Sequence, residues 1–224
     1  MSTRATYQFV ANPDRLLPAI TFYIHHDGYL EGAAAYFKAA MLNWTGGGLP
    51  ERFLRANDRA EFARDHQAHG DTEYRYTVDG TFLRAEKRYN WTEVFNGIFV
   101  GDLVEFVEKY GETKLLKWHD QYFDLELARG QLKVKLAEAK RQTESGWTGN
   151  ASSAMNEVWR FSMAMFKTFG PDEATEQASA EVQAADRIHC VAYGWPEQFK
   201  CTEEEAYVLW TQRFRIEDQS GGGA

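Results

Sequence analysis

The amino-acid sequence predicts an α+β fold: a mostly antiparallel sheet with N-terminal hairpins and helices, followed by a helical C-terminal part. Two observations lead to this prediction. Before residue 141, apolar residues recur at every second position in several short runs, which is the period of a β-strand. After the Ser/Gly/Thr-rich segment 142–153 they recur every three to four positions, which is the period of an α-helix. We therefore predict an α+β domain over residues 1–141, a linker or loop over 142–153, a helical part over 154–217 and a flexible tail over 218–224.

The α+β domain is predicted to begin with two strands and two helices. Both strands are rich in aromatic and β-branched residues, and Asp27-Gly28 ends the second one. The glycine run 46–48 ends the first helix, and Pro50 suits the first turn of the next. The predicted elements are the strands Thr3–Val10 and Ala19–His25 and the helices Leu30–Leu42 and Glu51–His66.

A hairpin is the clearest local signal of the sequence. Alternating apolar residues over 74–78 lead into Asp79-Gly80, and the alternation then resumes. An Asp-Gly pair between two such runs favours a tight hairpin turn. A strand over Thr92–Val100 and a short helix that ends at Gly111 are predicted to follow.

Residues 122–137 are predicted to form a second hairpin, because leucines and other apolar residues alternate with charged ones on both sides of a central loop. In this register Asp124 lies opposite Lys135. Glu126 likewise lies opposite Lys133. Opposite charges paired across a ladder stabilise it by roughly 0.2–1 kcal/mol each.

Three helices are predicted for the C-terminal part. Thr202 and Glu205 have the spacing of a capping box, which marks the start of the last helix. The predicted helices are Ala154–Phe169, Pro171–Cys190 and Glu203–Ile216.

The first of these helices is apolar on more than one side. Phe161 and Met165 fall off its main apolar stripe, and a helix of this kind must be buried on more than one side. A protein partner, a second copy of the chain or the other helices of the same chain could cover the second side. The stripe itself consists of Met155, Val158, Trp159, Phe166 and Phe169.

The chain has a net charge of −8, and its acidic residues concentrate near the C-terminus. Residues 171–224 contain eleven Asp or Glu and four Lys or Arg, a balance that suits a basic partner and repels nucleic acid. Cys190 and Cys201 have no Cys/His cluster around them, and no apolar run approaches the ~20 residues of a membrane span. We therefore expect a soluble cytoplasmic protein with free thiols and no membrane contact.

The segment His25-His26-Asp27 is the strongest candidate for chemistry. Neighbouring strand residues point to opposite faces, but the turn at Asp27-Gly28 could bring the side chains together. A metal-dependent hydrolase that uses this segment is therefore an alternative function. The sequence has no GK[ST] phosphate loop and no GxSxG motif, so we favour a protein without catalytic residues, metal or cofactor.

A nucleic-acid-binding accessory protein is a second alternative. Lys133, Lys135, Lys140 and Arg141 form a basic stretch that could follow a phosphate backbone. The acidic character of the whole chain argues against direct nucleic-acid binding.

The N-terminal segment resembles a family of poorly characterised proteins encoded by phages, prophages and plasmids. The matching segments are TRATYQF at Thr3–Phe9 and TFYIHHDGYLEGAAAYF at Thr21–Phe37, with Leu30 where the family usually has proline. The resemblance implies an accessory protein of a mobile element that acts in a bacterial host cell. Such proteins often antagonise host immunity by stoichiometric binding, and anti-CRISPR proteins are among them. The motif residues are His25, His26, Asp27, Gly28, Tyr29, Glu31 and Gly32.

Together these observations predict an inhibitor that binds a host defence complex such as CRISPR–Cas, with a homodimer as a further option. Its acidic, aromatic-rich C-terminal part supplies most of the expected binding surface. The residues predicted to bind the protein partner are Trp195, Glu203, Glu204, Tyr207, Trp210, Phe161 and Met165.

Overall fold

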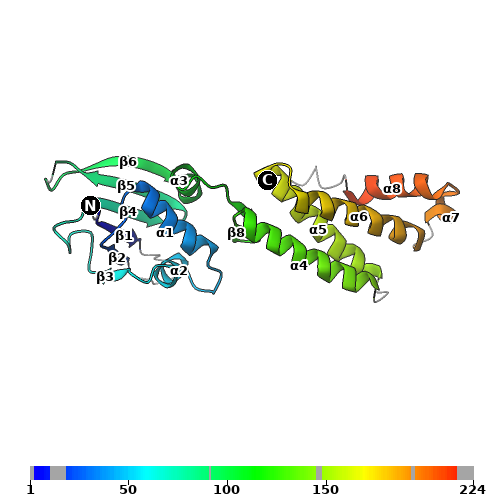
Figure 1. The fold of residues 1–224 in the computed structure, drawn as a ribbon, viewed down its shortest axis with the longest axis horizontal. Helices are drawn as coiled ribbons and strands as arrows, with labels where there is room; N and C mark the ends of the chain where they lie inside the picture. Colours follow the sequence, from blue (N-terminus) through cyan, green and yellow to red (C-terminus); the bar gives the residue numbers. More distant parts are fainter. Residues whose placement is uncertain (1–2, 11–18, 91, 145–147, 193–194, 216–224) are drawn as a thin grey trace. The chain divides into compact units, whose positions relative to one another are not determined.

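The computed structural model describes residues 3–10, 19–90, 92–144, 148–192 and 195–215, and of 148–152, 192, 195 and 213–215 it describes the backbone only. The chain forms two compact units, Met1–Asp124 and Leu125–Ala224, called here the α+β unit and the helical unit (Figure 1). A mostly antiparallel sheet in the first and helices throughout the second confirm the predicted α+β class. The predicted tail, 218–224, lies outside the described residues.

The α+β unit is built on a six-stranded sheet with the strand order β3-β2-β1-β4-β5-β6. All neighbouring strands are antiparallel except β1 and β4, which are parallel and register Tyr7 with Tyr76. The predicted Asp-Gly hairpin is the pair β4–β5. The strands are β1 (Ala5–Phe9), β2 (Ile20–Ile24), β3 (Glu61–Ala63), β4 (Tyr74–Asp79), β5 (Phe82–Arg88) and β6 (Phe95–Asp102).

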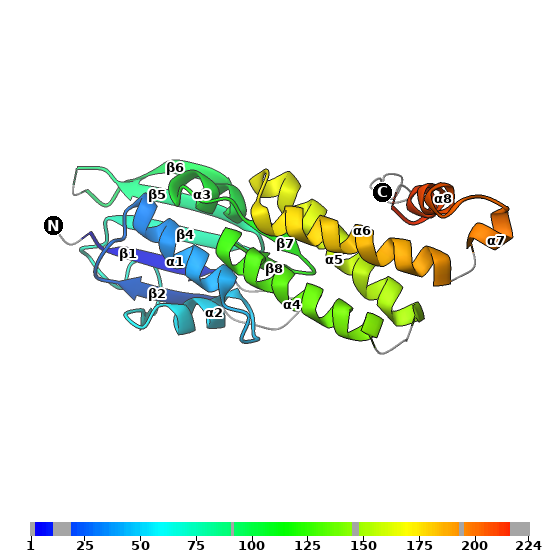
Figure 2. The same cartoon turned by 45° about the vertical axis from the view of Figure 1, so that its right-hand side comes forward.

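Three helices cover one face of this sheet, and α1 lies across the strands in Figure 2. They are α1 (Leu30–Leu42), α2 (Leu49–Ala56) and α3 (Leu103–Tyr110). The core beneath them is aromatic, and the ring centroid of Tyr7 lies 5.6 Å from that of Phe37, 4.9 Å from Phe53 and 5.0 Å from Tyr76. At alternate positions β4 and β5 carry mostly polar residues on the other face, which none of the described helices of this unit covers.

The predicted helix Glu51–His66 is wrong in its second half. Helix α2 ends at Ala56, where the Asn57 side chain donates a hydrogen bond to the Phe53 carbonyl at 2.7 Å. The chain then adds the short edge strand β3 beside β2. The sequence also gave no sign of the hairpin β7 (Leu116–Trp118) and β8 (Gln121–Phe123), whose turn residues have positive φ angles of 45° and 60°.

The helical unit consists of α4 (Leu125–Glu144), α5 (Thr148–Phe169), α6 (Glu173–Ala192), α7 (Trp195–Phe199) and α8 (Glu203–Arg215). Helices α4, α5 and α6 pack against one another, and α8 packs on α6. The helices predicted at 154–169, 171–190 and 203–216 are therefore present, and α5 begins within the segment predicted as a linker. The capping box is formed, because the Glu205 carboxylate accepts from the Thr202 backbone and hydroxyl at 2.9 Å.

The predicted hairpin over 122–137 is wrong, because residues from Leu125 onward form the helix α4. The buried positions Ala128, Leu132 and Ala139 follow helical spacing, whereas Val134, an apolar residue of the alternating pattern, is exposed. The charge pairs proposed across the hairpin are replaced by others. Lys135 pairs with Glu157 at 3.0 Å, Asp124 with Lys38 at 3.3 Å and Glu126 with Arg129.

Helix α5 buries a different stripe from the predicted one. Phe161 and Met165 are fully buried within the chain, together with Met155 and Val158. Phe166, which was assigned to the stripe, is 47% exposed. The other helices of the same chain therefore cover the second apolar side of α5, and no partner is needed for it.

Candidate functional site

The His-His-Asp-Gly motif forms a turn between β2 and α1. His25 and His26 are both exposed, and Nε2 of His25 lies 3.6 Å from the Glu61 carboxylate. Asp27 has a φ angle of 55°, so the chain turns in the left-handed region at this residue. Tyr29 then precedes the first turn of α1, where Glu31 is favourably placed at the positive end of the helix dipole.

The two glycines of the motif are required for close packing. A Cβ atom on Gly28 would lie 2.6 Å from the Cβ of Ala5, and one on Gly32 would lie 1.9 Å from the Asp27 carbonyl oxygen. The Gly28 carbonyl also accepts a hydrogen bond from the Tyr76 hydroxyl at 2.8 Å. These contacts explain why the motif contains two glycines: it forms the tightly packed connection between β2 and α1.

The structure gives the histidines of this turn no metal site. Among the residues that the structure describes, no three His, Cys, Asp or Glu side chains are grouped closely enough to hold a metal ion.

No helix among the described residues is long and apolar enough to cross a membrane.

A pocket with two arginines opens on the polar face of the sheet. Arg75 lies on β4 and Arg88 ends β5, and the cross-strand register places both on the face opposite the helices. The pocket has a volume of about 490 Å³. Its other lining residues are Gln67, His69, Gly70, Thr92 and Glu93.

Both guanidinium groups of this pocket lie against one aromatic ring. The guanidinium carbon of Arg75 is 3.6 Å from the centroid of the Phe95 ring, and that of Arg88 is 5.5 Å from it. The Nε atoms of both arginines are buried and have no hydrogen-bond partner within the described residues. Burial lowers the pKa of Arg75, and the charge of Arg88 lowers it further, although Glu86 opposes both effects.

The segment between β3 and β4 holds one wall of the pocket in place. Its His66 contacts the hydroxyl of Thr6 at 2.7 Å and that of Thr77 at 3.0 Å. His69 stacks on Tyr23 with ring centroids 3.7 Å apart. Burial lowers the pKa of His66 to about 4, so this side chain is neutral at pH 7 and adds no positive charge.

The predicted partner-binding residues of the last helix divide into two groups. Tyr207 and Glu204 hold α8 against α6, since the Arg187 guanidinium contacts the Glu204 carboxylate and lies 4.2 Å from the Tyr207 ring centroid. Trp210 is buried in a small cluster between the two helices. Glu203 is exposed and takes no part in the contacts described above. The side chain of Trp195 lies outside the described part of the chain.

The basic stretch of α4 is largely neutralised by acidic residues. Lys140 pairs with Glu181 at 2.6 Å, and Arg141 pairs with Glu138. Lys135 is occupied by the Glu157 contact described above. This arrangement weakens the case for a nucleic-acid surface on α4.

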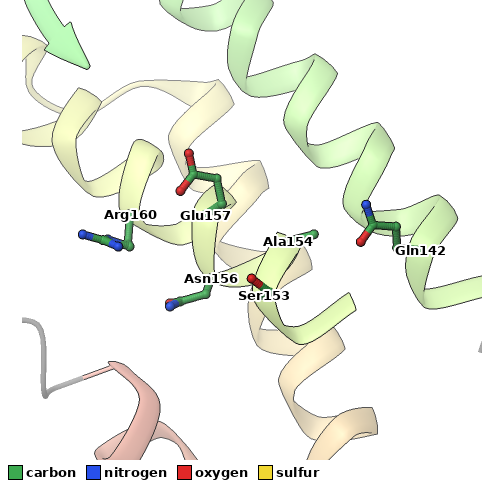
Figure 3. Close-up of a pocket in the computed structure, with 6 residues that line it drawn as sticks. All are labelled: Gln142, Ser153, Ala154, Asn156, Glu157 and Arg160. Carbon is green, nitrogen blue, oxygen red and sulfur yellow. The ribbon is translucent and has the colours of Figure 1, made fainter. Parts of the chain in front are cut away.

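A second polar pocket, of about 470 Å³, lies between α4 and α5 (Figure 3). Figure 3 shows that Asn156 and Arg160 extend to one side of α5 and that Glu157 points another way. The remaining lining residues are Gln142, Ser153 and Ala154.

Comparisons of the chain with protein-family models, with curated proteins and with solved structures found no match. The assignment of a function therefore depends on the geometry of the chain itself. Sequence reasoning did not select Arg75 or Arg88. The register of the Asp-Gly hairpin was the signal that could have found them, because it places both on the uncovered face.

Proposed function

We propose that the protein is a non-catalytic binding protein whose helical unit contacts a basic protein surface. The observation that carries the proposal is the outer surface of α8. Val208 and Leu209 are 44% and 38% exposed there, and the exposed Glu203 lies in the first turn of the same helix. A surface that combines apolar groups with carboxylates suits a partner with apolar side chains among basic ones.

The neighbouring helix α6 extends this character. Ile188 and Val191 are exposed, are three residues apart and therefore lie on one side of α6. Because α8 packs on α6, both helices can contribute to the same contact. A contiguous apolar patch bordered by polar residues is typical of a protein-interaction surface.

We further propose that the partner belongs to a bacterial defence complex of the CRISPR–Cas type. Support comes from the resemblance of the N-terminal segment to proteins of mobile elements and from the acidic helical unit. Complexes that hold RNA or DNA present basic grooves, and an acidic protein surface can compete for such a groove.

An interference assay tests this function in cells. Phages that a CRISPR–Cas system restricts are plated on cells that express the full chain. We expect the wild type to raise plaque formation at least tenfold, and the double variant Val208→Asp, Leu209→Asp to lose this effect. Both positions are exposed, so the change is expected to leave the fold intact.

Val134→Asp provides the matched control. Val134 is 64% exposed on α4, and its replacement adds one negative charge, half that of the double variant, at a different surface. Equal loss of activity in the control would remove α8 from the proposal. Unchanged restriction by every defence complex tested, together with no binding to the purified complexes, would refute the function.

A further inference from the structure

The residues of the arginine pocket in the α+β unit take no part in the contacts that the proposed function uses. The pocket lies on the sheet face opposite the three described helices of this unit, between the segment before β4 and the segment before β6. Its volume of about 490 Å³ is within the range of small-molecule sites, roughly 300–1,000 Å³.

From this geometry we infer that the pocket binds a phosphate monoester, namely the phosphoryl group of a nucleotide-sized ligand. Arg75 and Arg88 supply two positive charges beside the same ring, that of Phe95. A phosphate dianion can neutralise both charges, and guanidinium groups bind its oxygens through paired hydrogen bonds. Glu86 faces Arg75 across the ladder, but it is paired with Arg84 at 2.8 Å.

The Nε atoms of Arg75 and Arg88 do not provide the contact with the ligand. Both are buried from solvent and have no hydrogen-bond partner among the described residues, so a ligand in the pocket would have to bind the terminal guanidinium nitrogens. The cation–π contact of Arg75 with Phe95 satisfies no N–H group. Phosphate oxygens are negatively charged acceptors for the terminal N–H groups.

The rest of the lining suits the organic part of such a ligand. Glu93 and Gln67 offer acceptors for hydroxyl or amino groups, which a phosphate itself does not need. Gly70 leaves open space where a side chain would stand, so a ligand can approach the backbone there. His69 is held by its stack on Tyr23 and forms a preformed part of the wall.

Binding of adenosine 5′-monophosphate and of inorganic phosphate to the full chain tests the site, with adenosine as the probe without phosphate. We expect calorimetry at pH 7.5 to detect binding of adenosine 5′-monophosphate and of inorganic phosphate, and no binding of adenosine. Arg75→Gln and Arg88→Gln should each weaken binding of the monophosphate at least tenfold. Glu93→Gln should tighten binding of inorganic phosphate, because a repelling carboxylate is removed.

Lys87→Gln is the control for general charge. Lys87 precedes Arg88 in β5, points to the opposite face and does not line this pocket. Circular dichroism and thermal unfolding establish that each variant is folded, and Arg88→Gln carries the test if Arg75→Gln is not. Absence of binding by both phosphate probes at millimolar concentration, or equal weakening by Lys87→Gln and Arg88→Gln, would overturn the inference.

A third arm identifies the source of the phosphate. A short 5′-phosphorylated oligonucleotide is compared with the same oligonucleotide without its phosphate. We expect adenosine 5′-monophosphate to bind more tightly than either oligonucleotide. Tighter binding of the phosphorylated oligonucleotide, at the same arginines, would contradict the small-ligand assignment and assign the site to a nucleic-acid end.

Discussion

Replacement by phenylalanine is expected to change the free energy of unfolding in opposite directions at two stacked tyrosines in the core of the α+β unit. Tyr7 and Tyr76 are fully buried, and their ring centroids lie 5.0 Å apart with an interplanar angle of 13°. The Tyr76 hydroxyl donates to the Gly28 carbonyl at 2.8 Å, whereas the Tyr7 hydroxyl has no partner among the described residues. Phenylalanine keeps the ring and removes only the hydroxyl.

The expected magnitudes follow from these two environments. An unpaired buried hydroxyl costs about 1–3 kcal/mol, and the lost oxygen leaves a small void that offsets part of the gain. We therefore expect Tyr7→Phe to raise the free energy of unfolding by about 1 kcal/mol. Tyr76→Phe removes a bond and leaves the Gly28 carbonyl unsatisfied, so a loss of about 1–3 kcal/mol is expected.

Urea denaturation, followed by the near-UV circular dichroism of the aromatic core, measures both effects. With a slope of about 2 kcal/mol per molar urea, a gain of about 1 kcal/mol moves the midpoint up by roughly 0.5 M. The double variant shows whether the two rings are coupled beyond the sum of the single changes. Destabilisation by Tyr7→Phe of the size seen for Tyr76→Phe would refute the assignment of their hydrogen bonds.

Three further predictions concern single side chains. Burial lowers the pKa of His66 from 6.5 in the unfolded chain to about 4 in the folded one, so its contribution to stability is complete above pH 6.5 and is lost as the pH falls to 4. The expected loss is about 2–3 kcal/mol, and His66→Gln should remove this part of the pH dependence. Burial raises the pKa of the Cys190 thiol, so a thiol reagent at pH 7.5 should label Cys201 first, and equal labelling rates would contradict this. On α5, Phe161→Ala should cost about 3–5 kcal/mol and Phe166→Ala less than about 1 kcal/mol in thermal or urea unfolding, and equal costs would contradict the buried stripe.

The elements that the sequence predicted well are those with strong local signals. Helix α1 has its predicted bounds, because the turn at Asp27-Gly28 begins it and the glycines after residue 45 follow its end. The β4–β5 hairpin follows from its Asp-Gly turn. In both cases the residues that decide the structure lie within a few positions of it in the chain.

Helix α4 was missed because its residues fit two periods. Leu125 and Leu132, seven apart, lie on one side of a helix and also fit the arms of a hairpin. Gly130 weakened the helical interpretation, yet it sits in the middle of α4 with open space where a side chain would stand. Packing of Ala128 and Leu132 in the helical unit outweighs the cost of about 1 kcal/mol for one glycine.

The arginine pocket could not be derived from the sequence, because its walls come from segments that are distant in the chain. The hairpin register alone places Arg75 and Arg88 on one face of the sheet. The other wall depends on the path of the segment after β3, which His66 fixes through contacts to Thr6 and Thr77. No local pattern specifies such long-range contacts.

The open sheet face also gives the phosphate site a thermodynamic consequence. A ligand of this pocket binds the folded state alone, so at a hundredfold excess over its Kd it stabilises that state by about 2.7 kcal/mol. The unfolding temperature of the α+β unit should therefore rise with adenosine 5′-monophosphate and stay constant with adenosine. In Arg88→Gln the same additions should have little effect, because one of the two charges that hold the phosphate is gone.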